Sequence, residues 1–110
     1  MVSTRQEKMG GEIRKLAALF VSENSNRNSM ITVTRLELSP DFRNGTLYVT
    51  VFPTEREAQV IEFLNRRKRD LRDFIKSRLK TKIVPMLTIV IDKGEKNRQK
   101  IDQLLMDSEE

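Results

Sequence analysis

The sequence contains no cysteine, histidine or tryptophan. Without cysteine there can be no disulfide, iron–sulfur ligation or thiol catalysis, and such a composition is compatible with a reducing cytosolic compartment. Without histidine as well, zinc could be held only by carboxylates, and acid–base chemistry near neutral pH would need an Asp, Glu or Lys with a strongly shifted pKa. We therefore expect no enzyme, no metal and no cofactor.

Long apolar runs are also missing. No stretch approaches the ~18 apolar residues that a membrane span requires, and the first residues, "MVSTRQEKMGGEIRKLAALFV", lack the uninterrupted apolar core of a signal peptide. We expect a cytoplasmic protein that makes no membrane contact. The 110 residues suffice for one hydrophobic core, so we predict a single domain over residues 1–110, frayed at 109–110. We also expect a monomer.

Positive charge is present in excess and is unevenly distributed. The formal net charge is +5, from 21 Lys and Arg against 16 Asp and Glu. Residues 66–82 alone contain nine basic side chains and two acidic ones, Asp70 and Asp73, a net +7, so the rest of the chain carries −2. One segment therefore accounts for the basic character of the whole chain.

Apolar spacing predicts a first helix of about four turns. Its buried face would carry Met9, Ile13, Leu16 and Phe20. Thr4 and Glu7 can form a capping box at its start. Gly10 and Gly11 each cost a helix about 1 kcal/mol relative to alanine. Either the helix begins near Glu12 or another segment packs closely against the two glycines.

Two β-branched segments follow, "ITVTRLEL" at 31–38 and "TLYVTVF" at 46–52. The turn-forming sequence "SPDFRNG" separates them and predicts an antiparallel hairpin. In the second strand Leu47, Val49 and Val51 share one face. In the first, Ile31 and Val33 fall on the opposite face from Leu36 and Leu38 unless an extra residue near Thr34 or Arg35 forms a β-bulge. We predict that bulge.

The second half of the chain predicts a long helix, a third strand and a last helix. Thr54 and Glu57 can form a capping box for the long helix, whose inner stripe reads Ala58, Ile61, Leu64, Leu71, Ile75 and Leu79. The apolar run "IVPMLTIVI" predicts a strand at 86–91, with Pro85 before it. Ile101, Leu104 and Leu105 indicate a final helix. These elements predict an α+β domain, a three-stranded sheet with helices on one face.

The long helix carries a one-signed basic stripe. At 100° per residue, Arg66, Arg69, Lys76 and Lys80 point to solvent, while Arg67, Arg72 and Arg78 flank them. Clustered like charges repel one another, a cost that a polyanion such as RNA would reverse. A merely solvated face would more often mix both signs. The candidate RNA-binding residues are Arg66, Arg67, Arg69, Arg72, Lys76, Arg78, Lys80 and Lys82.

Few aromatic residues accompany this stripe. Phe63 and Phe74 lie beside it, and we interpret them as flank packing rather than base-stacking platforms, which favours recognition of a folded RNA backbone. Asp41 and Asp92 are assigned to a turn and to a helix start, where capping is the usual role. Gly45 and Gly94 are isolated, so no phosphate-binding loop is indicated.

Three segments together resemble the ribosome-binding factor A family. They are "VTRLELSPDFRNGTLYVTV", "LRDFIKSRLKTKIVPMLTIVID" and "RQKIDQLL", and the likeness runs from about Arg5 to Leu105. The resemblance implies a type II KH-like fold, no catalytic activity, and binding to the immature small ribosomal subunit through its ribosomal RNA. It further implies assistance in late maturation and support of growth in the cold.

The chain departs from that family in its long helix, where members commonly carry an Ala-x-Gly kink. The corresponding place here is Leu71-Arg72-Asp73, which leaves a straighter and a kinked helix both open. Two other functions also stay open. One is a general KH-like module for single-stranded RNA, and the other is an interaction adaptor that uses an open sheet edge or an apolar helix face.

Overall fold

The computed structural model describes residues 4–25, 28–79 and 83–94. Its elements are α1 (Thr4–Asn24), β1 (Met30–Leu38), β2 (Asn44–Phe52), a 3₁₀ helix η1 (Thr54–Arg56), α2 (Glu57–Arg66), α3 (Lys68–Arg78) and β3 (Met86–Ile91). The predicted element order is thus confirmed through β3. The predicted final helix at Ile101, Leu104 and Leu105, and the fraying at 109–110, lie outside the described residues.

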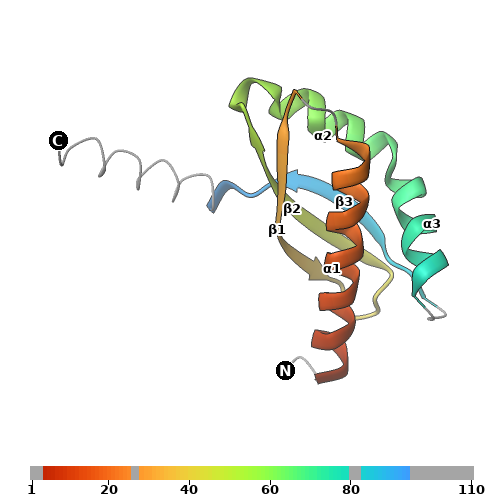
Figure 1. Cartoon of the computed structure of the whole chain (residues 1–110). Coiled ribbons are helices and arrows are strands. Elements are labelled where there is room, and N and C mark those ends of the chain that lie inside the picture. The colour runs from red at the N-terminus through yellow and green to blue at the C-terminus, as the bar shows by residue number, and fades with distance from the viewer. Residues whose placement is uncertain (1–3, 26–27, 80–82, 95–110) are drawn as a thin grey trace.

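The three strands form one sheet in the order β1-β2-β3. β1 and β2 are antiparallel, which confirms the hairpin, and β2 and β3 are parallel. A parallel pair needs a crossover connection, and α2 and α3 supply it. Figure 1 shows α1, α2 and α3 on one face of the sheet, so the α+β architecture is confirmed.

The core lies between the helices and that face of the sheet. The sheet contributes Leu47, Val49, Val51, Leu87 and Ile89, and the helices contribute Ile13, Ala17, Phe20, Val21, Val60, Leu64, Leu71 and Ile75. The prediction for Ala58 is wrong, because Ala58 is exposed and Val60 is buried in its place. Within α2, Val60 lies about 40° around the axis from the buried Leu64, whereas Ala58 lies about 120° away from it.

The predicted β-bulge is confirmed. Val33 pairs with Val49 but Arg35 pairs with Tyr48, so Thr34 is the extra residue. Before the bulge Ile31 and Val33 face the core, and after it Leu36 and Leu38 face the core as well, opposite Leu47 and Gly45. The bulge thus keeps the apolar side chains of both halves of β1 on the helix-covered face.

Two local predictions need correction. Asn44 and Gly45 lie in β2 rather than in the turn, and the positive backbone φ of the turn, 60°, falls on Phe42. Thr54 lies inside η1, and neither N-cap residue, Pro53 for η1 or Arg56 for α2, makes a side-chain capping bond. The 3₁₀ turn therefore replaces the predicted capping box.

Helix α1 begins at Thr4 and includes both glycines, so a start near Glu12 is excluded. A Cβ on Gly10 would lie 3.8 Å from Leu38 Cδ1, an ordinary contact, and a Cβ on Gly11 would meet nothing within 4 Å. The residues that the structure describes therefore do not provide the expected close packing. The side chain of Thr4 lies outside the described residues, so the first capping box stays a prediction.

Candidate nucleic-acid interface

The basic segment forms two helices rather than one. α2 ends at Arg66, Arg67 adopts φ −104° and ψ 15°, and α3 begins at Lys68. The Arg67 N–H donates to Leu64 O at 3.1 Å, a tighter turn than an α-helix makes. Figure 1 shows α2 and α3 running in different directions. The helix is therefore kinked without a glycine, and residues 71–73 lie inside regular α3.

Packing on different neighbours accounts for the change of direction. α2 contacts β2 and β3, whereas α3 contacts β3 and α1. The Asn65 amide fixes the end of α2, because Nδ2 donates to Ile61 O at 3.0 Å and to Ile89 O at 2.9 Å. In return the Ile89 N–H donates to Asn65 Oδ1 at 3.0 Å. One side chain thus satisfies the backbone of the edge strand β3 just before the break.

Three candidate cations gather on the outer side of α3. Arg69, Arg72 and Lys76 fall within about 60° around the helix axis, and all three are exposed. Leu71 and Ile75 are buried in the core. Arg72 Nε donates to Val84 O at 3.1 Å, which orients that guanidinium. Within the described part of the chain, Arg69 and Lys76 make no ion pair or hydrogen bond through their side chains.

Arg66 and Arg67 adjoin this group across the break but are held in ion pairs. Arg66 pairs with Glu62 one turn earlier, with side chains 74% and 64% exposed. Arg67 Nε lies 3.4 Å from Asp70 Oδ2. Exposed pairs of this kind contribute about 0–1 kcal/mol, so a phosphate can compete with either carboxylate. Of the straighter and the kinked helix that the sequence left open, the kinked one is present, and these five cations lie on the two helices and at the break between them.

Arg78 does not share this surface. It lies about 160° around the α3 axis from Lys76, and its guanidinium carbon sits 3.8 Å from the centroid of the Phe74 ring. Phe74 in turn packs edge-to-face against Phe20 of α1 at 5.5 Å. Arg78 is thus directed toward α1. Lys80 and Lys82 lie outside the described residues.

The two phenylalanines beside the cations, Phe63 and Phe74, differ in how far they are buried. Phe74 packs against the core, which confirms it as flank packing. Phe63 is 42% exposed, and the Arg67 guanidinium carbon lies 5.6 Å from its ring centroid. The Arg67–Phe63 pair therefore offers one accessible ring at the break in the helix.

We name the surface formed by Arg66, Arg67, Arg69, Arg72 and Lys76 the basic surface.

The sheet carries a second polar cluster that the sequence did not reveal. Asp92 is buried at 6% exposure, and its carboxylate accepts the Thr34 hydroxyl at 2.6 Å and lies 3.6 Å from Arg35 Nε. Asp92 directly precedes the helical residues 93–94, as the sequence predicted, and its carboxylate also ties the β-bulge to the end of β3. Tyr48 donates to Glu37 at 3.1 Å, and that hydrogen bond raises the pKa of Tyr48.

Among residues 4–25, 28–79 and 83–94 there is no group of three His, Cys, Asp or Glu side chains suited to a metal ion. No helix in the same ranges is long and apolar enough to cross a membrane.

Asp41 lies in the hairpin turn, where it accepts the Ser39 hydroxyl at 2.6 Å, which confirms its turn role.

Comparison with known proteins shows one family whose members match this chain in sequence and in fold. The family described as ribosome-binding factor A matches residues 5–105. A ribosome-binding factor A from Thermotoga petrophila is 32% identical over 106 residues, covering 93% of this chain and 81% of the relative. The solution structure of a Thermotoga maritima protein described as a ribosome-binding factor A matches with TM-score 0.70 and 29% identity, covering 86% and 92% of the two chains.

A third comparison extends the fold match. Coordinates of the Thermus thermophilus ribosome-binding factor A, fitted into the cryo-EM map of its complex with 30S, match with TM-score 0.67 and 21% identity. They cover 78% of this chain and 93% of the other. The family match spans nearly the whole sequence, and the helix order, mixed sheet and kinked second helix are present in the same chain. The chain belongs to the ribosome-binding factor A family.

Proposed function

We propose that this protein binds the small ribosomal subunit through ribosomal RNA and that the basic surface makes the contact. Membership of the family supports the choice of partner, and the Thermus thermophilus relative has been fitted into a 30S complex. The observation that carries the proposal is the pair of exposed cations Arg69 and Lys76, which make no ion pair within the described part of the fold.

The arrangement of the cations suits a phosphate backbone. Arg69, Arg72 and Lys76 lie along about two turns of α3, so they can follow successive phosphates, while Arg66 and Arg67 extend the row across the break. Arginine can contact phosphate oxygens with two N–H groups at once. Lys80 and Lys82 belong to the same proposal by sequence. Arg78, which stacks on Phe74, would act only at the margin of the interface.

The proposed role is that of an assembly factor rather than an enzyme. The protein would act in the cytoplasm on the immature subunit, assist its late maturation and support growth in the cold, as the family resemblance implies. Binding by charge and shape requires no catalytic group. A rigid kinked pair of helices anchored to β3 through Asn65 would present the cations in a fixed geometry.

Charge reversal on α3 tests the proposal. The double variant Arg69→Glu, Lys76→Glu should lose co-sedimentation with purified small subunits by at least tenfold, because two phosphate contacts become repulsive. Circular dichroism should be unchanged, since both side chains are exposed and make no described contact.

The matched control reverses two cations elsewhere. Lys8 on α1 and Lys93 after β3 are also exposed, and Lys8→Glu, Lys93→Glu changes the net charge by the same amount. This variant should bind within about threefold of the parent, because it removes only long-range attraction that salt screens. Equal losses in the two variants would show that net charge, not the basic surface, drives binding.

A further inference from the structure

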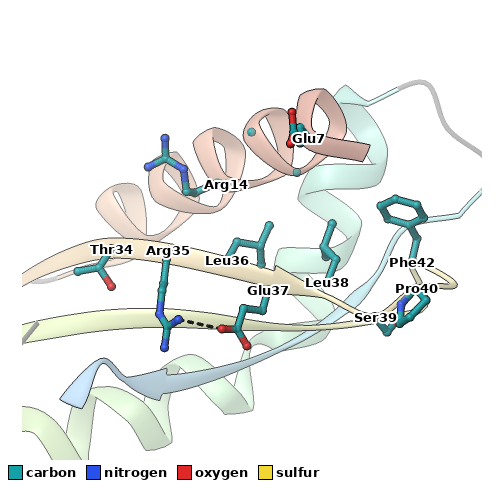
Figure 2. Close-up of a pocket in the computed structure, with 12 residues that line it drawn as sticks. Glu7, Arg14, Thr34, Arg35, Leu36, Glu37, Leu38, Ser39, Pro40 and Phe42 are labelled. Atoms are coloured by element: carbon teal, nitrogen blue, oxygen red, sulfur yellow. Dashed lines mark hydrogen bonds and ion pairs between the residues drawn. The ribbon is translucent and has the colours of Figure 1, made fainter. Parts of the chain in front are cut away.

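A groove of about 820 Å³ lies along β1, the strand at the opposite edge of the sheet from β3. Its walls include Gly10, Gly11 and Arg14 of α1, Leu36 and Leu38 of β1, and Phe42 of the hairpin turn. Figure 2 shows Leu36 and Leu38 directed from β1 toward α1, with Phe42 at the end of the groove. The groove therefore has an apolar floor between a helix and a strand.

β1 borders this groove with a free edge. Among the described strands it is an outer one, and there its sole pairing is with β2. In the described ranges no backbone hydrogen bond leaves its other edge. Beyond the bulge at Thr34, residues 35–38 run straight along the groove. β3 differs, because the Asn65 amide covers its outer edge. Free N–H and C=O groups on an edge strand can pair with another extended chain.

The two helical glycines keep the groove open. Each costs α1 about 1 kcal/mol relative to alanine, and neither has a positive φ that would require glycine. A Cβ on Gly10 would make an ordinary 3.8 Å contact with Leu38, and a Cβ on Gly11 would lie in open space. Packing within the described chain does not require these glycines. Their effect is to leave bare helix backbone facing the free edge of β1.

Charged side chains at the groove are balanced in sign. Glu7 and Arg14 both line it, about 10 Å apart along the α1 axis, and neither makes an ion pair among the residues described. Glu7 lies toward the hairpin turn and Arg14 toward Thr34 and Arg35 (Figure 2). Arg35 and Glu37 pair with each other at 2.8 Å. A polyanion such as RNA would gain little here, whereas a polypeptide with both charges would match.

We propose that this groove docks an extended segment of a partner protein, which adds as a strand to residues 35–38 of β1. Its side chains would cover Leu36, Leu38 and the bare backbone at Gly10 and Gly11. An antiparallel segment would place a basic residue near Glu7 and, two to four residues later, an acidic residue near Arg14. This protein contact is separate from the proposed RNA contact at the basic surface.

A peptide of defined charge order tests the proposal on the isolated protein. The probe is a ten-residue peptide that alternates valine and threonine, with lysine in its first half and glutamate in its second half. We expect it to shift the amide NMR signals of residues 10–14 and 35–38 and to slow amide hydrogen exchange in 35–38. The same peptide with the charge order reversed should bind at least tenfold more weakly.

The substitution Gly11→Leu fills the groove and should weaken the peptide at least tenfold. Glu12→Leu is the matched control, because Glu12 is exposed and lies about 100° around the helix from Gly11. That control should bind as the parent does, and neither variant should unfold at a lower temperature. Unchanged spectra at millimolar peptide, equal binding of both charge orders, or full binding by Gly11→Leu would each overturn the proposal.

A short RNA oligonucleotide provides a last comparison. If it, and not the peptide, perturbed residues 35–38, the groove would be an RNA site and the proposal of a protein partner would be wrong. Because small subunits are absent from these measurements, their outcome is independent of whether the basic surface binds ribosomal RNA.

Discussion

The glycines in helices and strands differ in how much space surrounds them, and Gly45 in β2 has the least. A Cβ on Gly45 would lie 2.7 Å from Leu87 Cδ2, 2.8 Å from Leu38 Cδ2 and 3.0 Å from Glu37 O. The last contact is with backbone, which cannot move aside independently. We expect Gly45→Ala to lower the free energy of unfolding by about 1–3 kcal/mol, the usual cost of overpacking, as measured by urea denaturation.

Gly11→Ala is the control for that prediction. It adds the same methyl group where nothing lies within 4 Å, so it should raise the free energy of unfolding by up to about 1 kcal/mol through helix propensity. A Gly45→Ala variant as stable as the parent would show that β2, β1 and β3 are less closely packed than described.

Asn65 is the residue whose importance the sequence did not indicate. Its amide makes two hydrogen bonds with the backbone of Ile89. Asn65→Leu, of similar size, should lower the free energy of unfolding by about 1–3 kcal/mol, because the N–H and C=O groups of Ile89 lose their partner. Gln59→Leu, at an exposed position of α2, should change it by less than about 0.5 kcal/mol. Equal unfolding midpoints for the two variants would contradict this role.

At the scale of elements, the hairpin turn depends on a hydrogen-bonded carboxylate. The Ser39 hydroxyl donates to Asp41 Oδ1 at 2.6 Å and the Arg43 N–H donates to it at 3.0 Å. These bonds, the Ser39 bond foremost, lower the pKa of Asp41 below its usual 3.8. The stability that Asp41 contributes is therefore present above about pH 3.8 and is lost as the pH falls through the lowered pKa.

Ser39→Ala should raise the pKa of Asp41 back toward 3.8, because the strongest stabilising bond to the carboxylate is removed. A titration of the Asp41 carboxyl carbon by NMR, from about pH 2 to about pH 6, measures this change. Ser77→Ala, which removes a hydroxyl that bonds Phe74 O on α3, should leave it unchanged. An Asp41 pKa that is the same in Ser39→Ala and the parent would exclude the proposed cause.

Elements set by local pattern could be predicted from the sequence, and those set by packing could not. The bulge at Thr34 follows from the broken alternation between Val33 and Leu36, and the strand 86–91 follows from its apolar run. The break at Arg67 has no glycine or proline to indicate it. It arises because α2 packs on β2 and β3 while α3 turns toward α1, with Asn65 fixed on Ile89.

The same break limited the prediction of the site. One uninterrupted helix would have aligned Arg66, Arg69, Lys76 and Lys80 in a single stripe. In the structure Arg66 belongs to α2 and pairs with Glu62, while Arg69, Arg72 and Lys76 form the group on α3. The sequence identified the segment correctly as basic and exposed. It could not show which cations were paired, because the contacts of Arg72 with Val84 and of Arg78 with Phe74 depend on tertiary packing and rotamers.

At the scale of the whole molecule, two surfaces of different chemistry lie toward opposite edges of the sheet. The basic surface lies on α2 and α3, which pack against β3 at one edge. The groove with its glycine-lined wall lies between α1 and β1 at the other edge. An assembly factor with this layout could hold RNA at one edge and a protein segment at the other. Each contact can be removed by substitutions that leave the opposite edge intact.

The salt dependence of binding to purified small subunits tests the central claim most directly. If about six phosphates are neutralised, affinity should fall by orders of magnitude between about 50 mM and about 200 mM salt. Arg69→Ala, Lys76→Ala should reduce the slope of log affinity against log salt by about two, because each lost phosphate contact removes about one released counterion. Lys8→Ala, Lys93→Ala should leave the slope unchanged. A parent slope near zero, or an identical slope in Arg69→Ala, Lys76→Ala, would contradict RNA binding by the basic surface.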